Sequence, residues 1–256
     1  MVVRSAPLPG RAVSLGVAVP PAGPGTCPRC HGPALGALAE CWCCHQVGSR
    51  LGTDDVGPPV VPVALCRPGD ELHSALRRYK DGPAVTARRH FADRLARMLS
   101  AFLEGHGPCL HGAVGTWEAM AVVPSSRRGH DAGACPSPFN VVVAGVAALA
   151  TLPRVPLGRG SSVAGHLQPA VDAFVVSGPV AGRKILLVDD TWVTGARARS
   201  AAAALTLAGA SVVAVLVIGR CIDPSASPHR ARWWEAQRAA TTSGAGRCCL
   251  VGCSIR

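Results

Sequence analysis

The chain has 256 residues, with 26 basic and 15 acidic side chains and a formal net charge of +11. Only Lys80 and Lys184 are lysines and the arginines are scattered, so the charge fits an anionic small molecule as well as a nucleic acid. The length allows one α/β domain with an appendage, or two small domains. The 12 cysteines favour metal binding over a secreted disulfide scaffold, because such scaffolds are short and cysteine-dense throughout, whereas five of these cysteines crowd into residues 27–44.

Residues 1–25 are rich in Pro, Gly and Ala without a sustained period, which is typical of a flexible leader. Their apolar stretch at residues 12–20 is short and interrupted by Gly16, so it is a poor signal peptide. We therefore expect a cytoplasmic protein.

A cysteine-rich module and a Gly/Pro linker occupy residues 26–62. Two C-x-x-C pairs, ten residues apart, have the spacing of a structural tetrahedral zinc site: Cys27, Cys30, Cys41 and Cys44. Cys43, His31 and His45 are alternative ligands, and a redox or disulfide role is the alternative to metal. Such a module is too small for a core of its own, so we expect it to fold on zinc and to suit contact with a protein or single-stranded DNA.

Residues 63–222 read as one α/β domain. A helix is predicted over residues 70–80, and the next segment places apolar side chains on one helical face: Phe91, Leu95, Met98, Leu99 and Phe102. Strands are predicted over residues 119–124, 172–176, 183–190 and 211–218, and further helices over residues 140–152 and 196–208. Apolar strands separated by helices predict a parallel sheet covered on both faces, with a mobile loop over residues 153–169.

Residues 201–219 carry no charge and approach the length of a membrane span. Gly209 divides the run into an alanine-rich helix and a β-branched strand, so we predict a helix–turn–strand unit and no membrane span. Residues 223–256 are predicted to form a C-terminal helix and a tail.

The segment ILLVDDTWVTGAR, residues 185–197, carries the candidate ligand site. Ligands of a parallel sheet bind beyond the carboxyl ends of its strands, which is where Asp189 and Asp190 are predicted to lie. Two carboxylates suit vicinal hydroxyls, because they only accept hydrogen bonds. The following loop leads into a helix N-terminus, which favours an anion, and comprises Thr191, Trp192, Val193, Thr194 and Gly195. Hydroxyls beside a phosphate describe a ribose 5-phosphate.

This segment resembles the phosphoribosyl-pyrophosphate signature of type I phosphoribosyltransferases. With the four-cysteine module and the LRRYK helix, the chain resembles the ComF family of competence-associated, phosphoribosyltransferase-like proteins from Cys27 to Arg220. The resemblance implies a type I phosphoribosyltransferase-like core over residues 63–222 and a small N-terminal zinc-knuckle module. It also implies that Asp189 and Asp190 hold the ribose hydroxyls, with catalysis centred there, and that residues 191–195 wrap the 5-phosphate.

The same resemblance implies a magnesium ion held mostly by substrate and water. The pyrophosphate would meet the loop after the first core strand, where four side chains can donate to it: Ser125, Ser126, Arg127 and Arg128. The chain departs from the family at Arg197, where small hydroxyl residues are usual, and at the bulky Trp192. These departures bear on catalysis more than on ligand binding.

Two functional hypotheses follow. The first is a phosphoribosyltransferase that binds phosphoribosyl pyrophosphate with Mg²⁺ and transfers the phosphoribosyl group to an unidentified acceptor. The second is a non-catalytic adaptor in DNA uptake that binds single-stranded DNA or a protein of the competence machinery.

Overall fold

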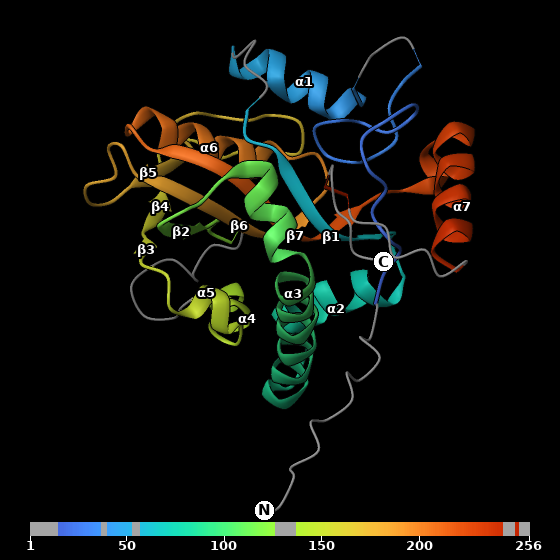
Figure 1. Ribbon diagram of the computed structural model, residues 1–256, viewed down its shortest axis with the longest axis horizontal. Coiled ribbons are helices and arrows are strands. Elements are labelled where there is room, and N and C mark those ends of the chain that lie inside the picture. Colours follow the sequence, from blue (N-terminus) through green and yellow to red (C-terminus); the bar gives the residue numbers. More distant parts are fainter. Residues whose placement is uncertain (1–14, 37–39, 53–56, 126–136, 243–248, 251–256) are drawn as a thin grey trace, which may run out of the picture.

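A parallel sheet with the strand order β1-β7-β6-β2-β3 forms the centre of the fold (Figure 1). The computed structural model describes residues 15–36, 40–52, 57–125, 137–242 and 249–250. The strands are β1 Val60–Cys66, β2 Ala119–Val122, β3 Arg154–Val155, β6 Lys184–Trp192 and β7 Ser211–Cys221. All four neighbouring pairs are parallel, which confirms the predicted α/β class.

Both faces of the sheet are buried. Ile185 and Leu187 of β6 belong to one apolar cluster, whereas Leu186 and Val188 belong to the other. This alternation follows from the period of two along a strand. In Figure 1, α1 and α6 lie on one side of the sheet and α2 to α5 on the other. The helices are α1 Trp42–Leu51, α2 Glu71–Asp81, α3 Val85–Val114, α4 Pro138–Ala144, α5 Ala147–Ala150, α6 Ala196–Leu207 and α7 Pro228–Thr242, with a short 3₁₀ turn at Pro224–Ala226.

The helices α2, α3 and α6 confirm the expectations from hydrophobic periodicity, but the helix predicted over residues 140–152 is divided into α4 and α5. The division falls at Gly145 and Val146. A Cβ at Gly145 would lie 3.0 Å from the Cβ of Ala96, so α4 ends where it approaches α3 closely.

Two strand predictions were incomplete. The segment predicted as a strand over residues 172–176 does contain β5, Phe174–Val176, but this strand lies outside the parallel sheet. It pairs antiparallel with β4, Leu157–Arg159, inside the segment predicted to be a loop. Conversely, β1 begins at Val60, in the predicted linker. Pro62 lacks an N–H donor, and it is tolerated because β1 is at the edge of the sheet.

The uncharged run over residues 201–219 is a helix–turn–strand unit, as predicted. The helix α6 ends at Leu207, Gly209 has a φ of 88°, and β7 begins at Ser211. Among the described residues, no helix combines the length and the hydropathy that a membrane crossing requires.

Packing at the centre of the sheet predicts that replacing one of two leucines by alanine lowers the free energy of unfolding much more than replacing the other. Leu216 in β7 is fully buried, whereas Leu207 at the end of α6 is 74% exposed. We expect Leu216→Ala to lower the free energy of unfolding by about 2–5 kcal/mol, because it leaves a cavity between packed side chains. Leu207→Ala is the control and should change it by less than about 0.5 kcal/mol. Urea denaturation of both variants would contradict this packing if their midpoints were the same.

Candidate functional site

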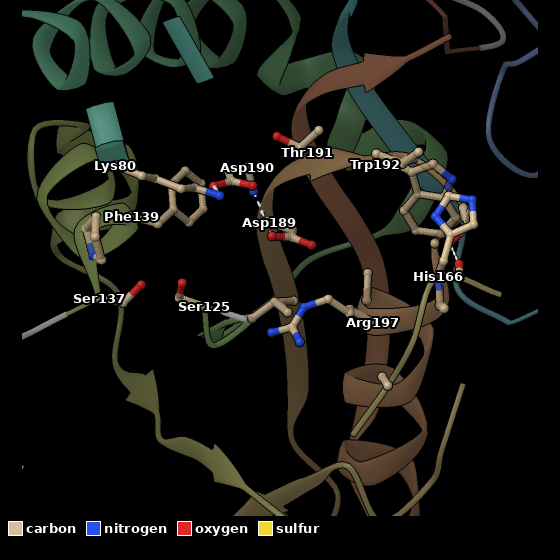
Figure 2. A pocket seen from close by; sticks show the side chains of 18 of the residues that line it. Lys80, Ser125, Ser137, Phe139, His166, Asp189, Asp190, Thr191, Trp192 and Arg197 are labelled. Carbon is tan, nitrogen blue, oxygen red and sulfur yellow. Dashed lines mark hydrogen bonds and ion pairs between the residues drawn. The ribbon is translucent and has the colours of Figure 1, made fainter. Parts of the chain in front are cut away.

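A pocket of about 330 Å³ lies at the carboxyl edge of the sheet, around the end of β6 (Figure 2). The sequence-predicted residues that line it are Ser125, Asp189, Asp190, Thr191, Trp192, Val193, Thr194 and Gly195. Ser126, Arg127 and Arg128, also predicted to bind ligand, lie outside the described residues. The pocket therefore brings together the end of β6, the residues that follow it, and Ser125 from the segment after β2.

The two carboxylates have different surroundings. Asp190 is buried, and its Oδ2 accepts a hydrogen bond from the Tyr79 hydroxyl and forms an ion pair with the Lys80 ammonium group, both on α2. Burial, followed by the charge of Asp190, raises the pKa of Tyr79 well above its usual value. The hydroxyl therefore stays protonated and acts as a hydrogen-bond donor to Asp190. The neighbouring sequence gave Asp190 no evident partner, since both partners lie on a helix more than a hundred positions upstream. Asp190 therefore ties α2 to β6.

Asp189 lines the same pocket and is less buried than Asp190. Its Oδ1 accepts a hydrogen bond from the backbone N–H of Asp190 at 2.8 Å, and the side chain is partly exposed. Figure 2 shows Asp189 between Asp190 and Arg197. Burial, with the nearby charge of Asp190, raises the pKa of Asp189 to about 7, against a smaller opposing effect of Lys80. This carboxyl group thus titrates near neutral pH.

The loop after β6 is shaped by a contact between Trp192 and Gly195. The bulky Trp192, noted from the sequence as a departure from the family, is 1% exposed and packs into the core while it lines the pocket. A Cβ at Gly195 would lie 2.1 Å from the Trp192 ring, and Gly195 has a φ of 84°. Only glycine fits both conditions. The chain can therefore turn directly from the loop into α6.

The side chains of Thr194 and Arg197 hold neighbouring segments around the pocket. The Thr194 hydroxyl donates a hydrogen bond to the carbonyl of His166, and Arg197 Nη2 donates one to the carbonyl of Pro124. The Arg197 guanidinium also lies over the ring of Phe174, 5.5 Å from its centroid. Arg197 is thus an arginine of the pocket wall, and its positive charge can face an anion.

Sequence reasoning missed the contribution of α2 and α4 to the pocket, which is lined also by Tyr79, Lys80, Ser137, Phe139 and His166. One signal was available for Lys80. It is one of two lysines in the chain, and it stands in the LRRYK helix that was noted only as a family resemblance.

Four cysteines are positioned to bind a metal ion. The sulfur atoms of Cys27, Cys30, Cys41 and Cys44 all lie within 4.8 Å of one another, and all four side chains are buried. The Sγ atoms of Cys30 and Cys41 are 3.6 Å apart, and the backbone N–H of Cys44 donates to Cys41 Sγ at 3.4 Å. Four sulfur donors that converge in this way suit a closed tetrahedral site.

The alternative ligands named from the sequence do not join this cluster. His31 Nδ1 is 2.9 Å from the carbonyl oxygen of Pro20, and His45 Nδ1 is 3.4 Å from a carboxylate oxygen of Glu40. Cys43 is outside the group of four sulfur atoms. The pairs Cys27/Cys30 and Cys41/Cys44, as the spacing predicted, therefore supply the donors.

The cysteine cluster is not a separate appendage. Its four cysteines belong to the same buried apolar cluster as Leu187 and Trp192, and α1 packs near α6. Buried Arg220, at the end of β7, lies close by. Although burial alone lowers the pKa of Arg220, the negative charge of the cysteines, Cys30 first, raises it by more. The module, which is too small for a core of its own, thus shares the core on the α6 side of the sheet.

No protein-family model matches the chain, and no curated protein matches it. Its chemistry therefore has to be judged from the two sites. The pocket combines a carboxyl group whose pKa is about 7, an ammonium group, a guanidinium group and the N-terminus of α6. Together these groups suit an anion that also carries hydroxyls. The cysteine cluster suits a soft divalent metal.

The pKa of Asp189 leads to a prediction about stability. Its value of about 7 in the fold is above the ordinary 3.8, so the stability linked to this group is fully present below pH 3.8 and is lost as pH rises through 7. Asp189→Asn should therefore raise the free energy of unfolding at pH 8 by roughly 1–3 kcal/mol. The advantage should shrink at pH 5 and level off above pH 7. Denaturant titrations at several pH values, with exposed Asp93→Asn as the control, would refute this if the advantage of Asp189→Asn did not vary with pH.

Proposed function

We propose that the chain is a phosphoribosyltransferase-like protein that binds phosphoribosyl pyrophosphate with Mg²⁺ in the pocket at the end of β6. The observation that carries the proposal is the convergence of Asp189, the loop over residues 191–195 and the N-terminus of α6 on one pocket. Hydroxyl acceptors beside an anion-binding helix end are what a ribose 5-phosphate needs. The resemblance to the ComF family rests on the same residues together with the cysteine cluster.

The 5-phosphate is assigned to the loop and to the first turn of α6. The first N–H groups of a helix have no partner within the helix, and its dipole favours negative charge there. Gly195, with its φ of 84°, lets the backbone turn into this helix end, and Gly195, Ala196, Arg197 and Ala198 line the pocket. Arg197 follows in the first turn, where a bound phosphate would offset its repulsion from the helix dipole.

The ribose hydroxyls are assigned to Asp189. Asp190 is already occupied by Tyr79 and Lys80, so its role is to hold α2 and the Lys80 ammonium group at the pocket wall. Lys80 and Arg197 then give the pocket positive charge toward a pyrophosphate. Magnesium, when bound with the substrate, would neutralise pyrophosphate oxygens. One partly exposed carboxylate suits an ion held mainly by substrate and water.

Transfer of the phosphoribosyl group is the second part of the proposal. The bond between the ribose C1 and the pyrophosphate oxygen breaks, pyrophosphate leaves with the bonding electrons, and the acceptor forms the new bond at C1. The cationic centre that develops needs position and charge rather than a covalent nucleophile of the protein. Asp189 is the negative group at hand to stabilise that charge through the ribose.

For the cysteine cluster we propose structural zinc. Four buried thiolates close a tetrahedral coordination sphere and leave no position for water or substrate. The sulfur donors favour zinc over magnesium or calcium, which prefer oxygen ligands. The cluster also contributes to the core on the α6 side of the sheet, which supports a structural rather than a catalytic role.

Ligand binding is predicted to depend on the ionised form of Asp189. In isothermal titration with Mg²⁺ and phosphoribosyl pyrophosphate at pH 8, Asp189→Asn should bind roughly 10- to 100-fold more weakly, because one or two charge-assisted hydrogen bonds are lost. The affinity of the wild type relative to that of the variant should rise about tenfold from pH 6 to pH 8, since the ionised fraction rises through a pKa of about 7.

The control is Asp93→Asn, which removes the same charge from the exposed face of α3. Equal affinities of wild type and Asp189→Asn would contradict the assignment of this carboxylate. Absence of any binding, together with salt-sensitive binding of single-stranded DNA, would favour the DNA-uptake adaptor instead. Release of pyrophosphate on incubation with candidate acceptors would support the transfer step.

The zinc content of purified variants should distinguish the proposed ligand Cys44 from the adjacent Cys43. Purified protein should contain about one equivalent of zinc, and Cys44→Ser should lose it because the site keeps only three thiolates. Cys43→Ser is the matched control, since this adjacent cysteine lies outside the cluster, and it should retain the metal. Metal analysis of the three proteins would count against the site if Cys43→Ser and Cys44→Ser behaved alike.

A further inference from the structure

Arg220 lies between the cysteine cluster and the loop over residues 191–195, which we call the ligand loop because the 5-phosphate is assigned to it. It stands near the end of β7, in register with Trp192 of β6, and is 4% exposed. A buried guanidinium group is costly unless charge and hydrogen bonds compensate it. Hydrogen bonds compensate only the Nη1 group of Arg220, since the buried Nε has no hydrogen-bond partner among the described residues; compensating charge comes from the nearby cysteines, Cys30 first.

On one side, Arg220 packs against the first knuckle of the cysteine module. A Cβ at Gly32 would lie 2.7 Å from Arg220 Nη2 and 3.2 Å from Nε, so the guanidinium lies almost directly against the backbone there. The carbonyl of Gly32 accepts a hydrogen bond from the backbone N–H of Cys27 at 2.7 Å. The knuckle that presents Cys27 and Cys30 is therefore the surface on which the arginine lies.

On the other side, Arg220 holds the backbone of the ligand loop. Its Nη1 donates to the carbonyl of Val193 at 2.6 Å and to that of Trp192 at 3.2 Å, and also to the carbonyl of Cys221 at 2.9 Å. Trp192 is the last residue of β6, and Val193 is the next residue toward Gly195. With their carbonyls turned toward Arg220, the course of the backbone into the turn at Gly195 is constrained.

We propose that Arg220 is a positioning residue that couples the cysteine cluster to the ligand loop, so that metal occupancy preorganises the loop for an anionic ligand. The proposal rests on the proposed function for the identity of the ligand and the metal. A tetrahedral site of four thiolates around a divalent ion has a net charge of −2 and places counter-charge beside the guanidinium. Arg220 is then held against Gly32 while its other edge fixes the carbonyls of Trp192 and Val193.

The coupling has a reciprocal consequence. If the loaded cluster makes the loop bind its ligand more tightly, the ligand must increase the affinity of the cluster for metal by the same factor. Typical couplings of this kind are about 5- to 150-fold. A loop preorganised in this way also loses less conformational entropy when the ligand binds.

Two variants interrupt the contact from opposite sides. Arg220→Met keeps much of the length of the side chain but removes its donors and its charge. Gly32→Ala keeps the arginine in the sequence but adds a methyl group 2.7 Å from Arg220 Nη2, so the guanidinium has to move away from the backbone of residue 32. Neither changes a cysteine of the cluster or a side chain that lines the pocket. Metal analysis should therefore still find about one equivalent of zinc in Gly32→Ala.

The deciding measurement is amide hydrogen exchange in the full-length, unliganded protein, read over residues 191–197. We expect exchange in this segment to be at least about tenfold faster in both variants, and also in wild type from which a chelator has removed the metal. The reference is α3, which lies on the other side of the sheet and should change much less (Figure 1). Unchanged exchange in the loop in both variants would overturn the proposal. So would an equal rise in α3, since Arg220 would then act only through overall stability.

A second measurement tests the reciprocal effect. Competition with a chromogenic zinc chelator, with and without saturating ribose 5-phosphate, should give a tighter apparent zinc affinity when the sugar phosphate is present. The effect should be lost in Arg220→Met and Gly32→Ala. Because hydrogen exchange needs no ligand, it decides the role of Arg220 even if ribose phosphates do not bind. An intact effect of ribose 5-phosphate in both variants would exclude Arg220 as the connection.

Discussion

The candidate site depends on one buried ionic interaction, between Asp190 at the end of β6 and the pair Tyr79 and Lys80 on α2. A carboxylate that is buried near the carboxyl end of a central strand needs a positively charged partner within the protein, because water is largely excluded there. Satisfying Asp190 draws α2 across the end of the sheet and forms one wall of the pocket. The adjacent Asp189 remains the less buried carboxylate of the two, and its pKa is raised by burial and by the charge of Asp190, against the opposing effect of Lys80.

The acidic pair is therefore a pair in sequence but not in role. Similar side chains one position apart face different surroundings, because successive residues of a strand point in different directions. Asp190 holds structure together, and we propose that Asp189 binds. This division gives a physical reason for two adjacent carboxylates in a chain that is otherwise poor in acidic residues: one holds Tyr79 and Lys80 at the pocket wall, and the other lines the pocket without such partners on α2.

The cysteine cluster bears on the same region through packing. It closes the core on the α6 side of the sheet, against side chains that include Trp192. The loop that follows β6 is thus bounded by α2 at Asp190, by the Trp192 ring under Gly195, and by Arg220 on the side of the cluster. A loop constrained on three sides can hold its backbone N–H groups in place before a ligand arrives, which is how a small site gains affinity without additional contacts.

The sequence by itself determined the elements whose signals are local. These include the parallel α/β class, the helices α2, α3 and α6, the helix–turn–strand unit at Gly209, the four cysteines, and the position of the acidic pair and its loop at a strand end. Each depends on spacing within a short segment, where periodicity, turn residues or ligand spacing carry the information. Tertiary structure alone decided that Pro62 stands in an edge strand, that β5 pairs outside the main sheet, that Tyr79 and Lys80 neutralise Asp190, and that Arg220 joins the cysteine module to the ligand loop. These features depend on which distant segments become neighbours, because burial and charge compensation are settled only when the chain has packed.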